Sequence, residues 1–140
     1  MLKEQFNDIL AEFGALVKCD VALDDDGFAS FMVDDDMIVN LRFLDASGTI
    51  IAFAPVGAFG GAGKEGEKAL ALLRMNDVGG LSEGFTLALD EDADLVLAMD
   101  RRSALEIASA DSLAAWVEAL VRVVRAVRGY FADNVPEEEV

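Results

Sequence analysis

The residues best suited to chemistry form one glycine-rich stretch, GAFGGAGKEGEK at 57–68, which ends in Gly63-Lys64 where a helix could begin. In P-loops the backbone N–H groups of such a stretch cradle phosphates, and a Ser or Thr after the lysine holds magnesium. Here Ala58 replaces the first glycine of that motif, and Glu65 replaces the hydroxyl residue. A carboxylate would therefore stand where the metal-binding hydroxyl belongs. We interpret the stretch as a connecting loop and not as a nucleotide site.

Two aspartate-rich segments, at 24–27 and 90–94, were compared with calcium-binding loops. An EF-hand loop needs oxygen ligands at its first, third and fifth positions, glycine at the sixth and glutamate at the twelfth. In the first segment Ala22 and Val33 fall at the first and twelfth positions, and in the second Arg101 falls where the glutamate belongs. Neither segment completes a site, so we predict no metal and interpret both as turns.

The side chains of common catalytic sites are also missing. The chain has no histidine, which excludes Ser-His and Cys-His catalysis within it. Its single cysteine, Cys19, allows no internal disulfide and is interpreted as a small apolar residue at a helix end. A pair of catalytic carboxylates stays open, because 27 acidic residues always offer some pair at a suitable separation. We predict that the protein is not an enzyme and needs no cofactor.

The charge balance limits the possible partners. The 27 acidic and 11 basic residues give a net charge of −16, although 54% of the residues are hydrophobic. Such a charge repels the phosphates of nucleic acids, and Arg122, Arg125 and Arg128, spaced along one helix face, are interpreted as solvated. The longest uncharged run, 48–63, is too short for a bilayer, which needs about 20 apolar residues. We therefore expect a cytoplasmic protein that binds neither nucleic acid nor membrane.

Hydrophobic periodicity predicts the elements that would position these residues. Helical spacing of apolar residues and alternation typical of strands follow one another along the chain. The predicted helices cover 2–18, 67–76 and 111–131, and the predicted strands cover 28–34, 37–44, 48–56, 84–90 and 94–100. Ser109 or Asp111 is the expected cap of the last helix. The order α-βββ-α-ββ-α predicts an α+β fold with a twisted, mainly antiparallel sheet packed by helices. We expect one domain over 1–132, followed by an acidic disordered tail at 133–140.

Both faces of the first three predicted strands are apolar. In the first strand Phe28 and Met32 point one way, while Phe31 and Val33 point the other. A sheet with one solvated face would alternate apolar with polar residues. We therefore expect a helix, a second subunit or a bound partner to cover the second face, with part of this surface left for a partner.

Four stretches resemble the type III secretion chaperone family, and within it the Tir chaperone group. They are FNDILAEFG at 6–14, GFASFMVDDDMIVNL at 27–41, ALALLRMN at 69–76 and GFTLALDEDADLVLAMDRR at 84–102. The resemblance covers residues 5 to 131, and Leu72, Leu73 and Asn76 are among its few fixed points.

The resemblance implies a cytoplasmic homodimer that binds the N-terminal segment of a secreted effector and holds it extended and secretion-competent. Carried over to this chain, it places the dimer interface at Leu70, Leu73 and Met75. It places the contacts with the partner at Phe6, Phe28, Met32 and Ile38. Each of these residues could instead belong to an ordinary core. An acidic dimeric interaction or regulatory module of the same fold, with no secretion role, is the alternative function.

Overall fold

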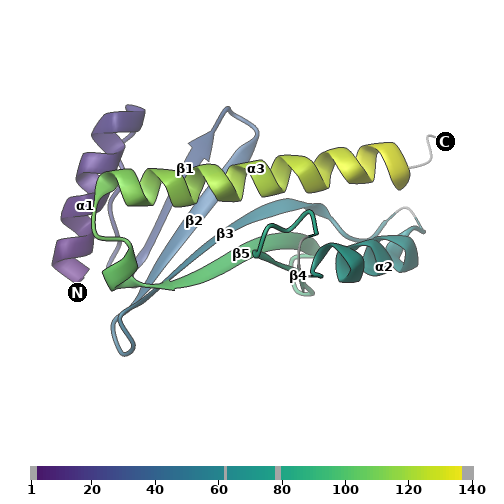
Figure 1. Cartoon of the computed structure of the whole chain (residues 1–140), viewed down its shortest axis with the longest axis horizontal. Coiled ribbons are helices and arrows are strands. Elements are labelled where there is room, and N and C mark those ends of the chain that lie inside the picture. Colours follow the sequence, from purple (N-terminus) through teal and green to yellow (C-terminus); the bar gives the residue numbers. More distant parts are fainter. Residues whose placement is uncertain (1–2, 62, 78–79, 137–140) are drawn as a thin grey trace.

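Three helices and five strands form the computed structural model of the chain, which describes residues 3–61, 63–77 and 80–136 (Figure 1). The elements are α1 (Lys3–Val17), β1 (Phe28–Val33), β2 (Met37–Leu44), β3 (Thr49–Ala58), α2 (Glu65–Met75), β4 (Thr86–Asp90), β5 (Leu95–Ser103), the short 3-10 helix η1 (Ala104–Glu106) and α3 (Ala110–Asn134). The predicted α+β class and the predicted order of elements are confirmed.

The five strands form one antiparallel sheet in the order β1-β2-β3-β5-β4. Short turns join β1 to β2 and β2 to β3, as the sequence predicts. The pairing of β3 with β5 joins the two groups of strands, and a register shift between Pro55 and Gly57 interrupts it. As a result β1 and β4 are the two edges of the sheet.

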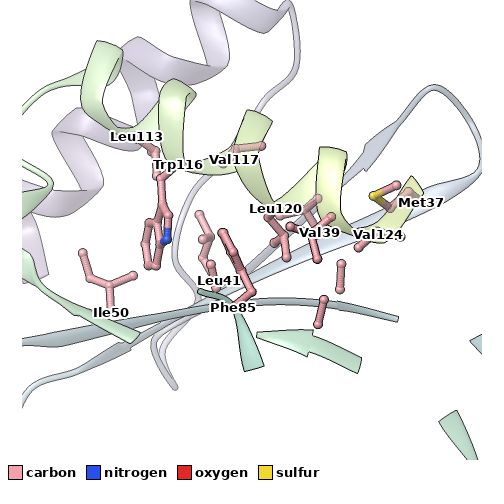
Figure 2. Packing of buried hydrophobic residues seen from close by; sticks show 14 of the residues in the cluster. Met37, Val39, Leu41, Ile50, Phe85, Leu113, Trp116, Val117, Leu120 and Val124 are labelled. Atoms are coloured by element: carbon pink, nitrogen blue, oxygen red, sulfur yellow. The ribbon is translucent and has the colours of Figure 1, made fainter. Parts of the chain in front are cut away.

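Helices α1 and α3 pack on the same face of the sheet. Phe6 of α1 stacks on Phe43 of β2 at 5.7 Å between ring centres, and Phe13 lies 5.3 Å from Phe31. Trp116, in the N-terminal half of the apolar stripe of α3, is fully buried above the sheet (Figure 2). The helix begins after Ser109, whose hydroxyl accepts a hydrogen bond from the Ser112 N–H and so confirms the predicted cap.

The opposite face of the sheet keeps accessible apolar residues. Burial alternates along β2, so that its odd-numbered residues face the helices and its even-numbered residues face away. Apolar side chains at the partly or largely exposed positions of this second face are Phe28, Met32, Ile38, Ile51, Phe53, Leu97 and Met99. We call this surface the open face.

Two helices differ in length from the prediction. Helix α2 starts two residues early, at Glu65, and α3 continues through Asp133 and Asn134, which the sequence assigns to the tail. The helix continues because Val135 is buried and its N–H donates to the carbonyl of Phe131. Residues 137–140 of the expected tail lie outside the described residues.

Candidate partner-binding site

A cavity of about 580 Å³ opens where α1, β1 and α3 meet, and we call it the α1–α3 pocket. Its apolar lining includes Phe13, Val17, Phe31, Val33, Val117 and Val121. Charged side chains lie among the lining residues as well, namely Asp34, Glu118, Arg122 and Arg125. An apolar hollow with a charged rim is suited to hold apolar side chains of another chain.

The chain reversal after α1 shapes one wall of this pocket. The Cys19 N–H donates to the carbonyl of Gly14, and the segment after the helix returns directly across that residue. A side chain at position 14 would overlap the carbonyl oxygen of Cys19, so the close approach depends on glycine. The reversal brings the only cysteine of the chain to the pocket wall.

The pocket lies beside the free edge of β1. The Phe28 N–H donates to Asp24 Oδ1 at 2.9 Å, and its carbonyl accepts from the Asp24 N–H at 2.7 Å, so its backbone points away from β2. Because direction alternates along an antiparallel strand, the backbone groups of Ser30 and Met32 point the same way. Among the described residues, no segment outside the sheet hydrogen-bonds to them. A strand edge with free donors and acceptors therefore borders an apolar pocket.

Asp24 also explains the first aspartate-rich segment. Its carboxylate accepts hydrogen bonds from the N–H groups of Asp26 and Phe28. In the second segment, the Asp90 carboxylate accepts from the Ala93 N–H. Both segments are turns stabilised by their own aspartates, as the sequence predicts.

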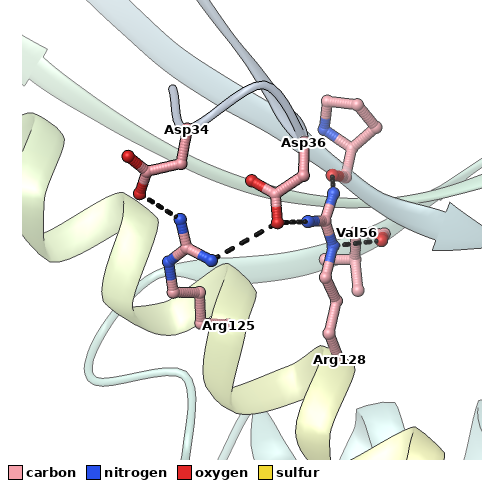
Figure 3. Close-up of polar contacts among 6 residues, drawn as sticks. Asp34, Asp36, Val56, Arg125 and Arg128 are labelled. Carbon is pink, nitrogen blue, oxygen red and sulfur yellow. Dashed lines mark hydrogen bonds and ion pairs between the residues drawn. The ribbon is translucent and has the colours of Figure 1, made fainter. Parts of the chain in front are cut away.

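At the rim of the pocket, arginines of α3 form ion pairs with aspartates of the β1–β2 turn (Figure 3). Arg125 forms ion pairs with Asp34 at 2.6 Å and with Asp36 at 3.4 Å, both in the β1–β2 turn. Arg128 pairs with Asp36 at 3.5 Å, and it also donates to the carbonyl of Val56 at 2.8 Å. The interpretation of these arginines as a solvated face is therefore wrong for Arg128, which is partly buried. Arg125 remains exposed, although its ion pairs also tie α3 to the β1–β2 turn.

Three of the four predicted partner-binding residues lie on the open face. Met32 and Ile38 are 51% and 44% exposed and stand opposite each other on β1 and β2. Phe28 is partly exposed, beneath the guanidinium of Arg42. Phe6 is different: it is fully buried against Phe43, because the inner stripe of α1 packs on the sheet, and so it belongs to the core.

The predicted dimer residues divide in the same way. Leu70 and Leu73 are exposed on α2, and Leu73 is 72% exposed. Met75 instead is buried with Ala71 and Leu72, because these three share the helix face that turns inward. Two further leucines, Leu81 and Leu89, are also exposed near α2 and β4, and neither is among the predicted dimer residues.

The glycine-rich loop directs described backbone donors toward carboxylates of the protein itself. The Gly60 N–H lies 3.1 and 3.2 Å from the two carboxylate oxygens of Asp94, and the Gly61 N–H donates to Glu65 Oε1 at 3.3 Å. A phosphate would have to displace both carboxylates. The geometry therefore agrees with a connecting loop.

Metal-ligating side chains do not gather in the described part of the chain, where no three His, Cys, Asp or Glu residues lie close enough to hold an ion. None of the helices in that part combines the length and the apolar character that crossing a bilayer requires.

The chain is similar to known proteins over nearly its whole length. A model of the Tir chaperone protein (CesT) family matches residues 8–128. A comparison with curated proteins finds no match.

Solved structures share the fold at low sequence identity. A chain of the ExsC-ExsE complex has a TM-score of 0.72 at 20% identity, covering 91% of this chain and 94% of that one. A chain of the HopA1-SchA chaperone-effector complex has a TM-score of 0.69 at 18% identity, covering 91% and 95%. The structure of the Yersinia pestis type III secretion chaperone SycH with a stable fragment of YscM2 has a chain with a TM-score of 0.66 at 22% identity, covering 87% and 98%.

Proposed function

The chain belongs to the Tir chaperone protein (CesT) family, and from this membership we propose that it is an effector chaperone of a type III secretion system. It acts in the cytoplasm as a homodimer, binds the N-terminal segment of a secreted effector and keeps that segment extended and competent for secretion. Two structures of the same fold are described as a chaperone-effector complex and as a type III secretion chaperone. This function requires neither catalysis nor a cofactor.

The observation that carries the proposal is the position of the α1–α3 pocket beside the free edge of β1. An extended peptide that adds to a sheet edge gains main-chain hydrogen bonds whatever its sequence, and pockets beside the edge select its side chains. Both features occur together here. A folded partner would need neither of them.

The binding mode follows from the geometry of the edge. The client segment pairs with the outward N–H and C=O groups of Ser30 and Met32 and becomes a further antiparallel or parallel strand. Because side chains alternate along a strand, every second client residue enters the apolar pocket. The residues between them lie on the other side, next to Ile38 of the open face and to Met32, which borders both surfaces. Pocket and open face thus accept the two sides of one extended segment.

The same mode accounts for secretion competence. A segment held as an added strand cannot pack into a core of its own, and its apolar side chains are kept away from other chains. The net charge of −16 keeps the loaded chaperone soluble, because like-charged molecules repel one another.

The exposed leucines of α2 support the homodimer. Leu70 and Leu73 project from the helix surface, and Leu81 and Leu89 are exposed nearby. Exposed apolar patches of this kind mark association surfaces. In a two-fold dimer the same patch serves on both subunits, so one self-complementary surface is sufficient.

Client binding is tested with the native cysteine as a probe. Partners captured with the tagged protein from its own cytoplasm are identified by mass spectrometry, and the N-terminal segment of the captured effector is then prepared alone. Because Cys19 lines the pocket and is the only cysteine, its rate of maleimide labelling reports whether the pocket is filled. We expect the segment to slow labelling about tenfold or more, since bound side chains exclude the reagent.

A matched pair of variants locates the contact. Val17→Glu places a charge on the exposed part of the pocket lining, while Leu105→Glu places the same charge on the exposed η1 leucine. We expect Val17→Glu to weaken binding of the segment about tenfold or more, because an unpaired charge is desolvated, and Leu105→Glu to leave it unchanged. Equal affinity of both variants, or unchanged labelling of Cys19, contradicts the pocket as the client site. If the captured partner is a folded protein and its isolated N-terminal segment does not bind, the result favours the regulatory alternative.

A further inference from the structure

Lys68, the fourth residue of α2, is a buried cation without a carboxylate partner among the described residues. The residue is only 4% exposed. Its Nζ donates to the carbonyl of Ala58 at 3.0 Å and lies 5.9 Å from the ring centre of Phe131. An ammonium group has three donors. One carbonyl and the face of one ring leave two of them without an acceptor in the described part of the chain.

This arrangement is unusual in so acidic a molecule. Buried charges are normally paired, since an ion without a counter-ion loses hydration that nothing replaces. The partly buried lysine four residues earlier, Lys64, follows the common pattern and pairs with Glu67 at 3.6 Å. With 27 acidic residues in the chain, a buried lysine that has no carboxylate partner in the part of the chain that the structure describes points to a carboxylate from elsewhere.

A cavity of about 220 Å³ lies beside this lysine, between the end of β3, α2 and the end of α3. Lys68 and Arg128 both line it, together with Phe131 and Pro136. Arg128 uses its donors on the carbonyls of Pro55 and Val56 and on Asp36, so its role at the cavity is its positive charge. The start of α2 adds the positive end of a helix dipole.

We propose that this cavity is a carboxylate-binding site, in which Lys68 donates hydrogen bonds to an acidic side chain of a peptide segment. The charge-assisted bonds satisfy the two free donors. The positive charge of Arg128 adds attraction, and the ring of Phe131 packs beside the entering side chain. The site is separate from the α1–α3 pocket and does not depend on the effector-binding proposal.

The carboxylate has two possible sources. The first is this chain itself, because Pro136 lines the cavity and the sequence continues with Glu137, Glu138 and Glu139. A tethered group so close in sequence has a local concentration on the order of millimolar. The second source is an acidic residue of a bound partner.

A double-mutant cycle on the full chain tests the first source. The thermal midpoint is measured at low salt for the wild type, for Lys68→Gln, for the combined Glu137→Gln, Glu138→Gln and Glu139→Gln variant, and for all four substitutions together. If the tail binds, its neutralisation lowers the midpoint by about 3 °C in the wild type and has no effect beside Lys68→Gln. Lys64→Met is the control, and in this variant neutralising the three glutamates should lower the thermal midpoint as much as it does in the wild type.

The second source is tested with triglutamate as the probe and triglycine as its neutral control. Binding is followed by NMR through the amide shifts of Ala58 and Phe131. A saturable shift with triglutamate, lost in Lys68→Gln and retained in Lys68→Arg, supports a carboxylate supplied by a partner. If the tail shows no coupling to Lys68 and triglutamate causes no saturable shift, the free donors bind only water and the proposal is wrong.

Discussion

The side chain of Asn76 occupies the outer edge of β4, where the sheet ends. Its side-chain N–H donates to the carbonyl of Leu87 at 2.9 Å, and its side-chain oxygen accepts from the Leu87 N–H at 2.8 Å. The amide thus makes the two hydrogen bonds that a neighbouring strand would make with β4. An edge closed in this way is protected from unwanted pairing. Asn76 was a fixed point of the family resemblance, and this contact gives a physical reason for that residue type.

Changing Asn76 separates its two roles as donor and acceptor. Asn76→Ala removes both hydrogen bonds, whereas Asn76→Asp can accept from the Leu87 N–H but cannot donate to its carbonyl. We expect both variants to lose about 1–3 kcal/mol of unfolding free energy in urea, because backbone groups of β4 lose their partner. The control is Asn134→Ala, since Asn134 is exposed and, among the described residues, its side chain donates to the carbonyl of Tyr130 alone. Equal stability of Asn76→Ala and Asn134→Ala would contradict the bridging role.

At the scale of elements, α3 is joined to the sheet in two different ways. Apolar packing runs along the helix from Leu113 and Trp116 to Val127, all of them buried. The C-terminal half is attached in addition by Arg125 and Arg128, which reach the β1–β2 turn and the irregular end of β3 (Figure 3). The irregularity at Pro55 and Gly57 removes carbonyls from the sheet ladder, and Arg128 supplies the missing donors. The polar attachment leaves the α1–α3 pocket open beside it.

The two arginines should contribute unequally to stability. Arg128→Met leaves the carbonyls of buried Val56 and of Pro55 without their donors, which we expect to cost about 1–3 kcal/mol. Arg125→Met removes ion pairs with Asp34 and Asp36, both exposed, and should cost about 1 kcal/mol or less. Urea unfolding at low and high salt checks both values, and only the Arg125 contribution should fade with salt. A larger loss for Arg125→Met than for Arg128→Met would overturn this assignment.

At the scale of the whole molecule, the helices cover only one face of the sheet. The open face and the exposed leucines of α2 and β4 keep apolar surface in contact with water. A monomer of this size with such surfaces is suited to association, and its acidic charge limits unspecific contacts. The proposed dimer surface on α2 and the proposed client site at the β1 edge are therefore separate.

The dimer surface is tested by one charge at its most exposed leucine. Leu73→Asp should convert the homodimer to a monomer, because a carboxylate buried at an interface loses its hydration without gaining a partner. We expect the dissociation constant to rise about a hundredfold, measured as molar mass by light scattering over a dilution series. Leu105→Asp is the control, since Leu105 is 74% exposed and lies on η1, away from α2. An unchanged dimer mass in a folded Leu73→Asp variant means that another surface forms the dimer.

Prediction from the sequence succeeded where the signal is local. The first helix was expected over 2–18 and covers Lys3–Val17, and the second strand was expected and found at 37–44. The family resemblance, and not periodicity, indicated Leu70, Leu73, Met32 and Ile38, and the structure leaves all four exposed. The resemblance also indicated Phe6 and Met75, which the structure buries, because both helices carry apolar residues over a wide arc and the sequence does not say which part of the arc packs inward.

The sequence by itself determined the α+β class, the order of elements, the turns made by Asp24 and Asp90, and the strongly acidic surface, since all of these depend on neighbouring residues or on composition. The tertiary structure decided which elements meet. The α1–α3 pocket joins Phe13, Phe31 and Val117, and the buried Lys68 lies against Phe131, far away in the chain. Such contacts depend on how the chain closes and packs over long separations, and no local pattern of residues records that geometry.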